Sequence, residues 1–239
     1  MTSQVSTSTT APHERRCGCC GQPRKRLIEL GVTPGVFICR TCALWAAGRA
    51  AERKPLDERE AKEVSARAAQ TRAAIHAELD QASDAFDSLV RDASKSDLRR
   101  RSNGTRWSDR QLLFHMVFGY LIVLRLLPLV RLFGRLPDRA STIFAAVLDM
   151  AKVPFHVINF VGSLGGGTIV SPRLQVKLME RILWRLHRRI DVEQAGDLDL
   201  RMHFPVSWDP FFKDTMTLAE VYHFGTQHFE FHRSQLALP

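Results

Sequence analysis

The chain has 239 residues, enough for one or two domains and for a hydrophobic core that needs no disulfide bonds. Hydrophobic residues make up 45% and charged residues 25% of the sequence, which excludes a wholly disordered or fibrous protein. The formal net charge of +9 predicts only a general attraction to acidic partners. Local residue patterns must therefore carry the functional argument.

Residues 1–13 are predicted to form a disordered polar tail. This segment has neither the basic start nor the apolar centre of a signal peptide. A secreted protein of this size more often distributes an even number of cysteines through its fold. Here all the cysteines lie in residues 14–50, namely Cys17, Cys19, Cys20, Cys39 and Cys42. Their clustering predicts metal binding in a reducing, cytoplasmic environment.

Two Cys-x-x-Cys pairs organise residues 14–50. Cys17 and Cys20 form the first pair, and Cys39 and Cys42 form the second. Each pair can supply two thiolates to a tetrahedral zinc ion, with Zn–S bonds of about 2.3 Å. A redox-active pair would need a surrounding βαβ pattern, which this sequence lacks. We therefore predict a structural Cys₄ zinc finger in which Cys19 is a spare thiol.

A linker at residues 51–57 is predicted to separate the finger from a second domain, residues 58–238. Apolar residues between Val64 and Val90 recur at steps of three, four and seven, which predicts a helix over residues 57–93. Nothing in this domain alternates convincingly with a period of two. The predicted fold class is therefore mainly α, a helix bundle preceded by a small finger.

Two later helix starts carry capping boxes. Ser108 with Gln111 and Thr217 with Glu220 each place a hydroxyl residue three positions before a side chain that can reach back to the cap. Such caps contribute about 1 kcal/mol each to helix stability. Ser171, followed by proline, predicts a third helix start, with a helix over residues 171–190.

The region between these starts is unusually apolar. We predict a helix over residues 137–160 that is kinked or broken at Pro154, followed by a flexible glycine loop at residues 165–167. Residues 153–172 carry no charge but include Pro154, His156 and Asn159. A spanning helix needs about 20 predominantly apolar residues, so we predict no transmembrane segment.

Three of the nine histidines form a candidate metal site. His228 and His232 lie four residues apart on the Thr217-capped helix, so both side chains share one face, as two ligands of one ion require. His115, two turns into the Ser108-capped helix, is the candidate third ligand. A histidine on an apolar face is also a common core residue, and i, i+4 pairs arise by chance. Spacing alone therefore leaves both interpretations open.

The sequence around these histidines extends the argument. Residues 107–115 read W-S-x-x-x-x-L-x-H, and residues 228–236 read H-x-x-x-H-x-x-Q-L. Both resemble helices of the DinB/YfiT-like superfamily of metal-binding four-helix bundles, over residues 58–238. The resemblance implies that His115, His228 and His232 bind a divalent metal ion such as Zn²⁺, Ni²⁺ or Fe²⁺.

The finger is similar to a different family. Its cysteine spacing, with Leu27 and Ile28 between the pairs and a helical stretch after Cys42, resembles the N-terminal zinc-binding domain of the ClpX unfoldase. That module is treble-clef-like, dimerises and binds adaptors. The resemblance implies a protein partner or self-association through the finger, and so a homodimer.

Three functions follow as hypotheses. Members of the DinB-like superfamily include bacillithiol- and mycothiol-dependent transferases and an isomerase, which implies a thiol S-transferase or isomerase that acts on a small thiol and an electrophile. The cations are mostly arginine, which suggests a GC-rich host and therefore mycothiol. The alternative is a non-enzymatic stress or scaffold protein whose finger recruits a partner. The third is a nucleic-acid-binding regulator that uses basic residues of the finger.

Overall fold

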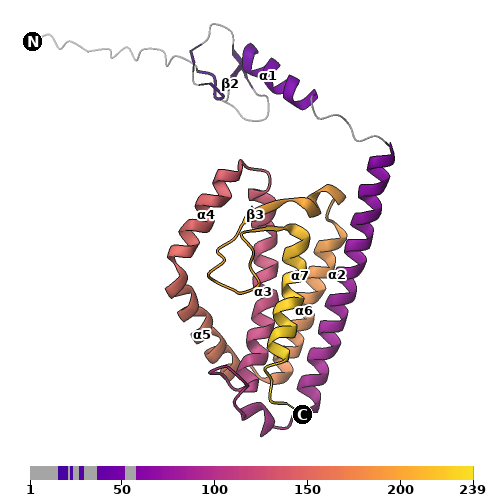
Figure 1. Ribbon diagram of the computed structural model, residues 1–239, viewed down its shortest axis with the longest axis vertical. Coiled ribbons are helices and arrows are strands. Elements are labelled where there is room, and N and C mark those ends of the chain that lie inside the picture. Colours follow the sequence, from indigo (N-terminus) through magenta and orange to yellow (C-terminus); the bar gives the residue numbers. More distant parts are fainter. Residues whose placement is uncertain (1–15, 21, 24–26, 30–36, 52–57, 239) are drawn as a thin grey trace, which may run out of the picture. The chain divides into compact units, whose positions relative to one another are not determined.

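The computed structural model describes residues 16–20, 22–23, 27–29, 37–51 and 58–238 (Figure 1). The predicted tail and residues 52–57 of the predicted linker lie outside these ranges. The chain divides into two compact units, Met1–Glu58 and Arg59–Pro239. Each unit is described by itself.

The first unit combines a short hairpin with a helix. Strands β1 (Leu27–Glu29) and β2 (Phe37–Cys39) pair antiparallel, with Ile28 opposite Ile38. Helix α1 (Arg40–Ala51) follows β2 without a break. This arrangement puts Cys39 at the end of a strand and Cys42 in the first turn of the following helix.

The second unit is built on four long helices that lie side by side (Figure 1). They are α2 (Glu58–Asp92), α3 (Asp109–Phe133), α6 (Pro172–Asp191) and α7 (Leu218–Arg233). In the figure α3 and α6 run in the same direction and α2 and α7 in the other, so a long crossover must join α3 to α6. The predicted mainly α bundle is therefore confirmed.

The core lies where the apolar faces of these helices meet. On α2 the buried residues fall at the predicted steps: Ala68, Ile75, Leu79, Ala82 and Phe86. Helix α3 occupies the central position and packs against α5, α6 and α7. Its central position explains why its sequence is apolar on nearly every side.

The crossover differs from its prediction in two ways. It consists of α4 (Asp138–Met150) and α5 (Lys152–Ile169), which meet at Ala151 and not at Pro154. Pro154 lies in the first turn of α5, where a missing N–H costs nothing. The predicted glycine loop is also wrong, because residues 165–167 are helical. A Cβ atom at Gly166 would clash with the ring of Phe114, so glycine lets α5 pack closely on α3.

A small hairpin precedes the last helix. Strands β3 (Arg201–His203) and β4 (Thr215–Thr217) pair antiparallel, and residues 204–214 connect them. Short 3₁₀ helices, η1 (Asp97–Arg99) and η2 (Ala195–Asp199), complete this unit. The sequence did not predict these strands, because three residues are too few for a clear alternating pattern.

The predicted helix starts are confirmed. The Thr217 hydroxyl accepts from the Glu220 N–H at 3.1 Å, and the Glu220 carboxylate accepts from the Thr217 N–H at 2.8 Å. At α3 the Gln111 carbonyl accepts from the Ser108 N–H at 3.0 Å. The Ser171 hydroxyl caps α6 by accepting from the Leu174 N–H. These caps fix where the helices that carry the candidate site begin.

Two parts of the chain have the hydropathy of a membrane span. Helix α3 is long and apolar enough by itself, and α4 and α5 pass the same test only as a pair bent by 66°. Half of the apolar window of α3 is buried in the protein, as expected of the central helix of a bundle. By length and composition alone α3 is therefore a candidate span among the described residues, and the central helix of a bundle passes the same test.

A buried ion pair provides a test of this packing. The Glu193 carboxylate is fully buried and binds the Arg131 guanidinium, while the Tyr222 hydroxyl donates to its other oxygen at 3.1 Å. Arg131→Met would leave that charge without its cation and should lower the free energy of unfolding by about 3–5 kcal/mol. Chemical denaturation measures this loss. Arg135→Met is the control: it removes a more exposed bridge to Asp197 and should cost less than about 1 kcal/mol. Equal effects would contradict the prediction.

Candidate metal centres

The four cysteines of the two Cys-x-x-Cys pairs lie together. Their sulfur atoms are all within 4.8 Å of one another, a separation at which they can hold one metal ion. Cys17 and Cys39 are buried, whereas Cys19 is exposed and does not belong to the cluster. The donor set is that of a structural zinc site, in which four thiolates leave no coordination position free.

Backbone N–H groups surround these sulfur atoms. The Cys39 N–H donates to Cys17 Sγ at 3.3 Å, and the Cys42 N–H donates to Cys39 Sγ at 3.5 Å. Hydrogen bonds from the backbone of Cys20 and Cys39 lower the pKa of Cys17 to about 6. Those of Cys42 likewise lower the pKa of Cys39. The loop therefore favours the metal-binding thiolate form at Cys17 and Cys39, whereas the neighbouring Cys39 and Cys20 side chains raise the pKa of Cys42.

The three predicted histidines converge in the second unit. His115 lies on α3, and His228 and His232 lie one turn apart on α7, the helix that packs against α3. The ring centroids are 5.0 Å apart for His115 and His228, 4.6 Å for His115 and His232, and 4.5 Å for the pair on α7. One ring nitrogen from each lies within 4.8 Å of the other two, so the group can hold a metal ion.

A glycine makes this convergence possible. Gly119 lies one turn after His115 on α3, directly beside the His228 ring. A Cβ atom at this position would be 2.6 Å from His228 Nδ1, closer than such atoms approach in proteins. Only glycine therefore lets α3 approach the ring without displacing it.

Two of the histidines are oriented by neighbouring polar groups. His232 Nδ1 donates to the Gln235 side-chain carbonyl at 2.7 Å, and His115 Nδ1 is hydrogen-bonded to the Ser163 hydroxyl at 3.0 Å. Their Nε2 atoms consequently face each other, 3.2 Å apart. Metal-binding histidines almost always have such a partner on the ring nitrogen that does not bind the metal.

The third histidine retains a buried nitrogen without a partner. His228 is only 5% exposed, and its Nδ1 makes no hydrogen bond. An unpaired buried polar nitrogen is destabilising unless something binds it. A metal ion would satisfy this atom, so the residues present fit a divalent ion held by three imidazoles.

Burial also sets the charge of the rings. It lowers the pKa of His115 to about 3, with a smaller contribution from His232. Burial, and then the other two histidines, lowers the pKa of His228 well below its usual value. The pKa of His232 is lowered by burial as well. All three rings are therefore neutral at pH 7, the form in which imidazole binds a metal.

Aromatic side chains surround the rings. Trp107 lies 4.6 Å from His115 and stacks on Phe160, while Phe224 lies 5.7 Å from His228. Phe231 is 5.1 Å from His232 on the same helix. These contacts limit the access of water, which strengthens electrostatic interactions within the site.

A carboxylate in the loop between β3 and β4 also approaches this group. Asp209 Oδ2 lies 3.8 Å from His228 Nε2, and Asp209 Oδ1 accepts from the Phe211 N–H at 2.9 Å. Burial raises the pKa of Asp209, although the Phe211 hydrogen bond opposes this. No sequence pattern pointed to this residue, because it is distant along the chain from every histidine of the group.

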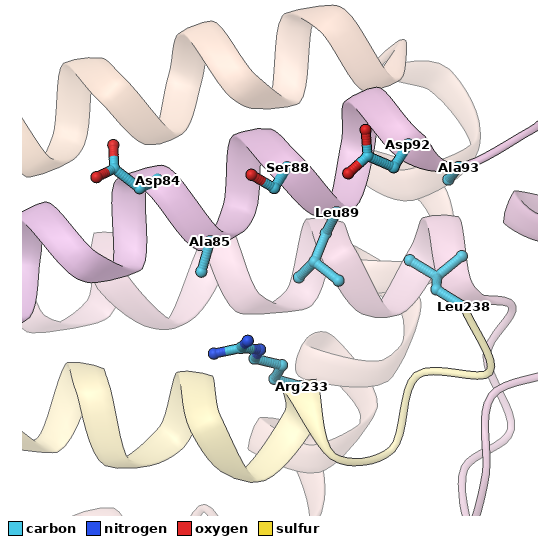
Figure 2. A pocket seen from close by; sticks show the side chains of 8 residues that line it. All are labelled: Asp84, Ala85, Ser88, Leu89, Asp92, Ala93, Arg233 and Leu238. Carbon is cyan, nitrogen blue, oxygen red and sulfur yellow. The ribbon is translucent and has the colours of Figure 1, made fainter.

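A separate pocket lies between α2 and the end of α7. It has a volume of about 300 Å³, and Figure 2 shows Ala85 and Leu89 of α2 pointing toward Arg233. No histidine or cysteine lines it.

Comparison with known families identifies the second unit. A model of the DinB superfamily matches residues 78–236, which is more than half of the chain. The chain belongs to the DinB superfamily. No curated protein and no solved structure matches it. The match begins after the finger, whose similarity to the ClpX zinc-binding domain stays a prediction.

The DinB resemblance was thus confirmed, and it had named the three histidines that the fold brings together. Glu230, between the two histidines of α7 in sequence, is exposed and pairs with Arg233, as its position on the helix predicts. Ser163 was missed because the predicted helix ended at residue 160, whereas α5 continues to Ile169.

A pair of glycine substitutions tests the geometry. Gly119→Ala should displace the His228 ring and lower the metal affinity of the histidine group at least about 10-fold, because ligand orientation limits affinity. Competition with a chelator measures this affinity. Gly162→Ala is the control, since a Cβ atom there meets nothing within 4 Å. Unchanged affinity in Gly119→Ala would contradict the proposed packing.

Proposed function

We propose that the protein is a metal-dependent thiol S-transferase or isomerase of the DinB superfamily, working with a low-molecular-weight thiol such as mycothiol in the cytoplasm. One observation carries this proposal: His115, His228 and His232 are buried, neutral and converging, and Nδ1 of His228 has no protein partner. Three histidine ligands leave one coordination position for water or substrate, as in catalytic metal sites and unlike a closed Cys₄ site.

A divalent ion such as Zn²⁺, Ni²⁺ or Fe²⁺ at this position would lower the pKa of a bound thiol, so that the sulfur attacks an electrophile as thiolate. The protein supplies the orientation. Gln235 holds His232 with Nε2 toward His115, and Ser163 binds the opposite nitrogen of His115. Trp107 and Phe160 form an apolar wall beside the rings, which favours exclusion of water from the reacting sulfur.

The finger supports a second, compatible role. Ile28, Leu44 and Trp45 are 55%, 61% and 66% exposed in the first unit. Exposed large apolar side chains, and tryptophan in particular, are typical of protein-binding surfaces. We propose that the zinc-bound finger docks on a protein partner or on a second copy of the chain to form a homodimer. In a scaffold protein, this docking would be the main function.

Metal content and thiol conjugation together test the enzyme proposal. The wild-type protein should bind two metal ions per chain; His228→Ala should lose one and Cys17→Ala the other. His228→Ala should also slow conjugation of mycothiol to monochlorobimane by more than about 100-fold, the upper limit for loss of an outer-shell group. Fluorescence measures the rate.

Cys17→Ala is the matched control and should retain conjugation, because its thiol lies in the other centre. If His228→Ala keeps its full metal content and rate, the proposal is wrong. If the wild type binds the second ion but does not accelerate conjugation of any low-molecular-weight thiol tested, the scaffold role is favoured.

A further inference from the structure

The three histidines differ in how their outer nitrogens are held. Ser163 and Gln235 bind the outer nitrogens of His115 and His232, but His228 has no hydrogen bond from either ring nitrogen to such a group. The polar group that faces its Nε2 is the Asp209 carboxylate, at 3.8 Å. This distance is longer than a hydrogen bond, and the neutral His228 ring forms no ion pair with the carboxylate.

Asp209 lies outside the set of ligand atoms. The group whose atoms all lie within 4.8 Å of one another contains the three histidines and not Asp209. The carboxylate therefore approaches His228 from its Nε2 side, whereas the unpartnered nitrogen of that ring is Nδ1. This is the arrangement of a carboxylate that orients a ligand rather than that of a fourth ligand.

The charge of Asp209 is otherwise uncompensated. Its side chain is only 17% exposed, and one oxygen is already held by the Phe211 N–H. Within the described ranges no lysine or arginine forms an ion pair with it. A buried carboxylate without a cation is destabilising. A divalent ion on the far side of His228 would supply the compensating charge.

The loop that carries Asp209 is anchored to the crossover. Trp208 donates from Nε1 to the Leu148 carbonyl at 2.9 Å, and its ring stacks on Phe155 with centroids 3.8 Å apart. Ser207 donates to the Asp149 carboxylate at 2.7 Å. The two residues before Asp209 are thus fixed on α4 and α5, so the position of the carboxylate is set by the fold.

We propose that Asp209 is the anionic positioning residue of the histidine centre: it accepts the proton on Nε2 of His228 and so leaves Nδ1 to bind the metal ion. This inference rests on the proposed metal-binding function. Metal retention in this bundle then depends on the loop between β3 and β4 as well as on the helices.

Metal affinity of full-length variants tests the proposal. Asp209→Asn should weaken Co²⁺ and Zn²⁺ binding at the histidine centre about 10- to 100-fold, the usual effect of removing an outer carboxylate. Asp209→Glu keeps the charge and should bind more tightly than Asp209→Asn. Asp214→Asn is the matched control, because Asp214 is an exposed carboxylate of the same loop that pairs with His203. It should bind as the wild type does.

Two further readouts separate positioning from a general effect on folding. The Co²⁺ absorption spectrum should change in Asp209→Asn and stay unchanged in Asp214→Asn. Nitrogen-15 NMR of the zinc-loaded wild type should show His228 bound through Nδ1 and protonated at Nε2. Binding through Nε2, or wild-type affinity in both Asp209 variants, would overturn the inference but leave the proposed function intact. A wild type with no metal at the histidines would overturn both.

Discussion

The close approach of α3 to α7 is the contact on which the candidate site depends. His115 and the pair on α7 are more than 100 residues apart in the chain, and their side chains meet because Gly119 lets the His228 ring lie against the α3 backbone. The capped starts of both helices fix the register of this contact. The crossover adds Ser163 from α5 and anchors the loop that carries Asp209.

Burial of three imidazoles is unfavourable in itself, and the way the protein compensates indicates what the site binds. Desolvation keeps the rings neutral, which avoids mutual repulsion and leaves lone pairs available. Outer hydrogen bonds satisfy His115 and His232, whereas Nδ1 of His228 stays unpaired. A cation at the centre would satisfy this nitrogen and offset the buried carboxylate of Asp209. A histidine cluster that served only packing would need neither feature.

Local signals predicted most of the bundle. The apolar spacing on α2, the capping boxes at Ser108 and Thr217, and the Ser171 start were all confirmed. The crossover was harder to predict. From the sequence alone, a proline in the first turn of a helix and glycines at a helix contact both resemble helix breaks. Their effect depends on the neighbouring helix, as the contact between Gly166 and Phe114 shows.

The candidate site was likewise predictable only in part from the sequence. The i, i+4 spacing identified two histidines and left His115 as a candidate third ligand. The resemblance to the DinB superfamily supported that choice, because no local pattern could place His115 beside the other two. Ser163 and Asp209 come from distant segments whose packing carries no sequence signature.

Anomalous X-ray diffraction from crystals of the zinc-loaded full-length protein is the most direct test of the centre. We predict a peak bonded at about 2.0–2.1 Å to one nitrogen of each histidine. A peak at the cysteines, with none between these three rings, would contradict the account.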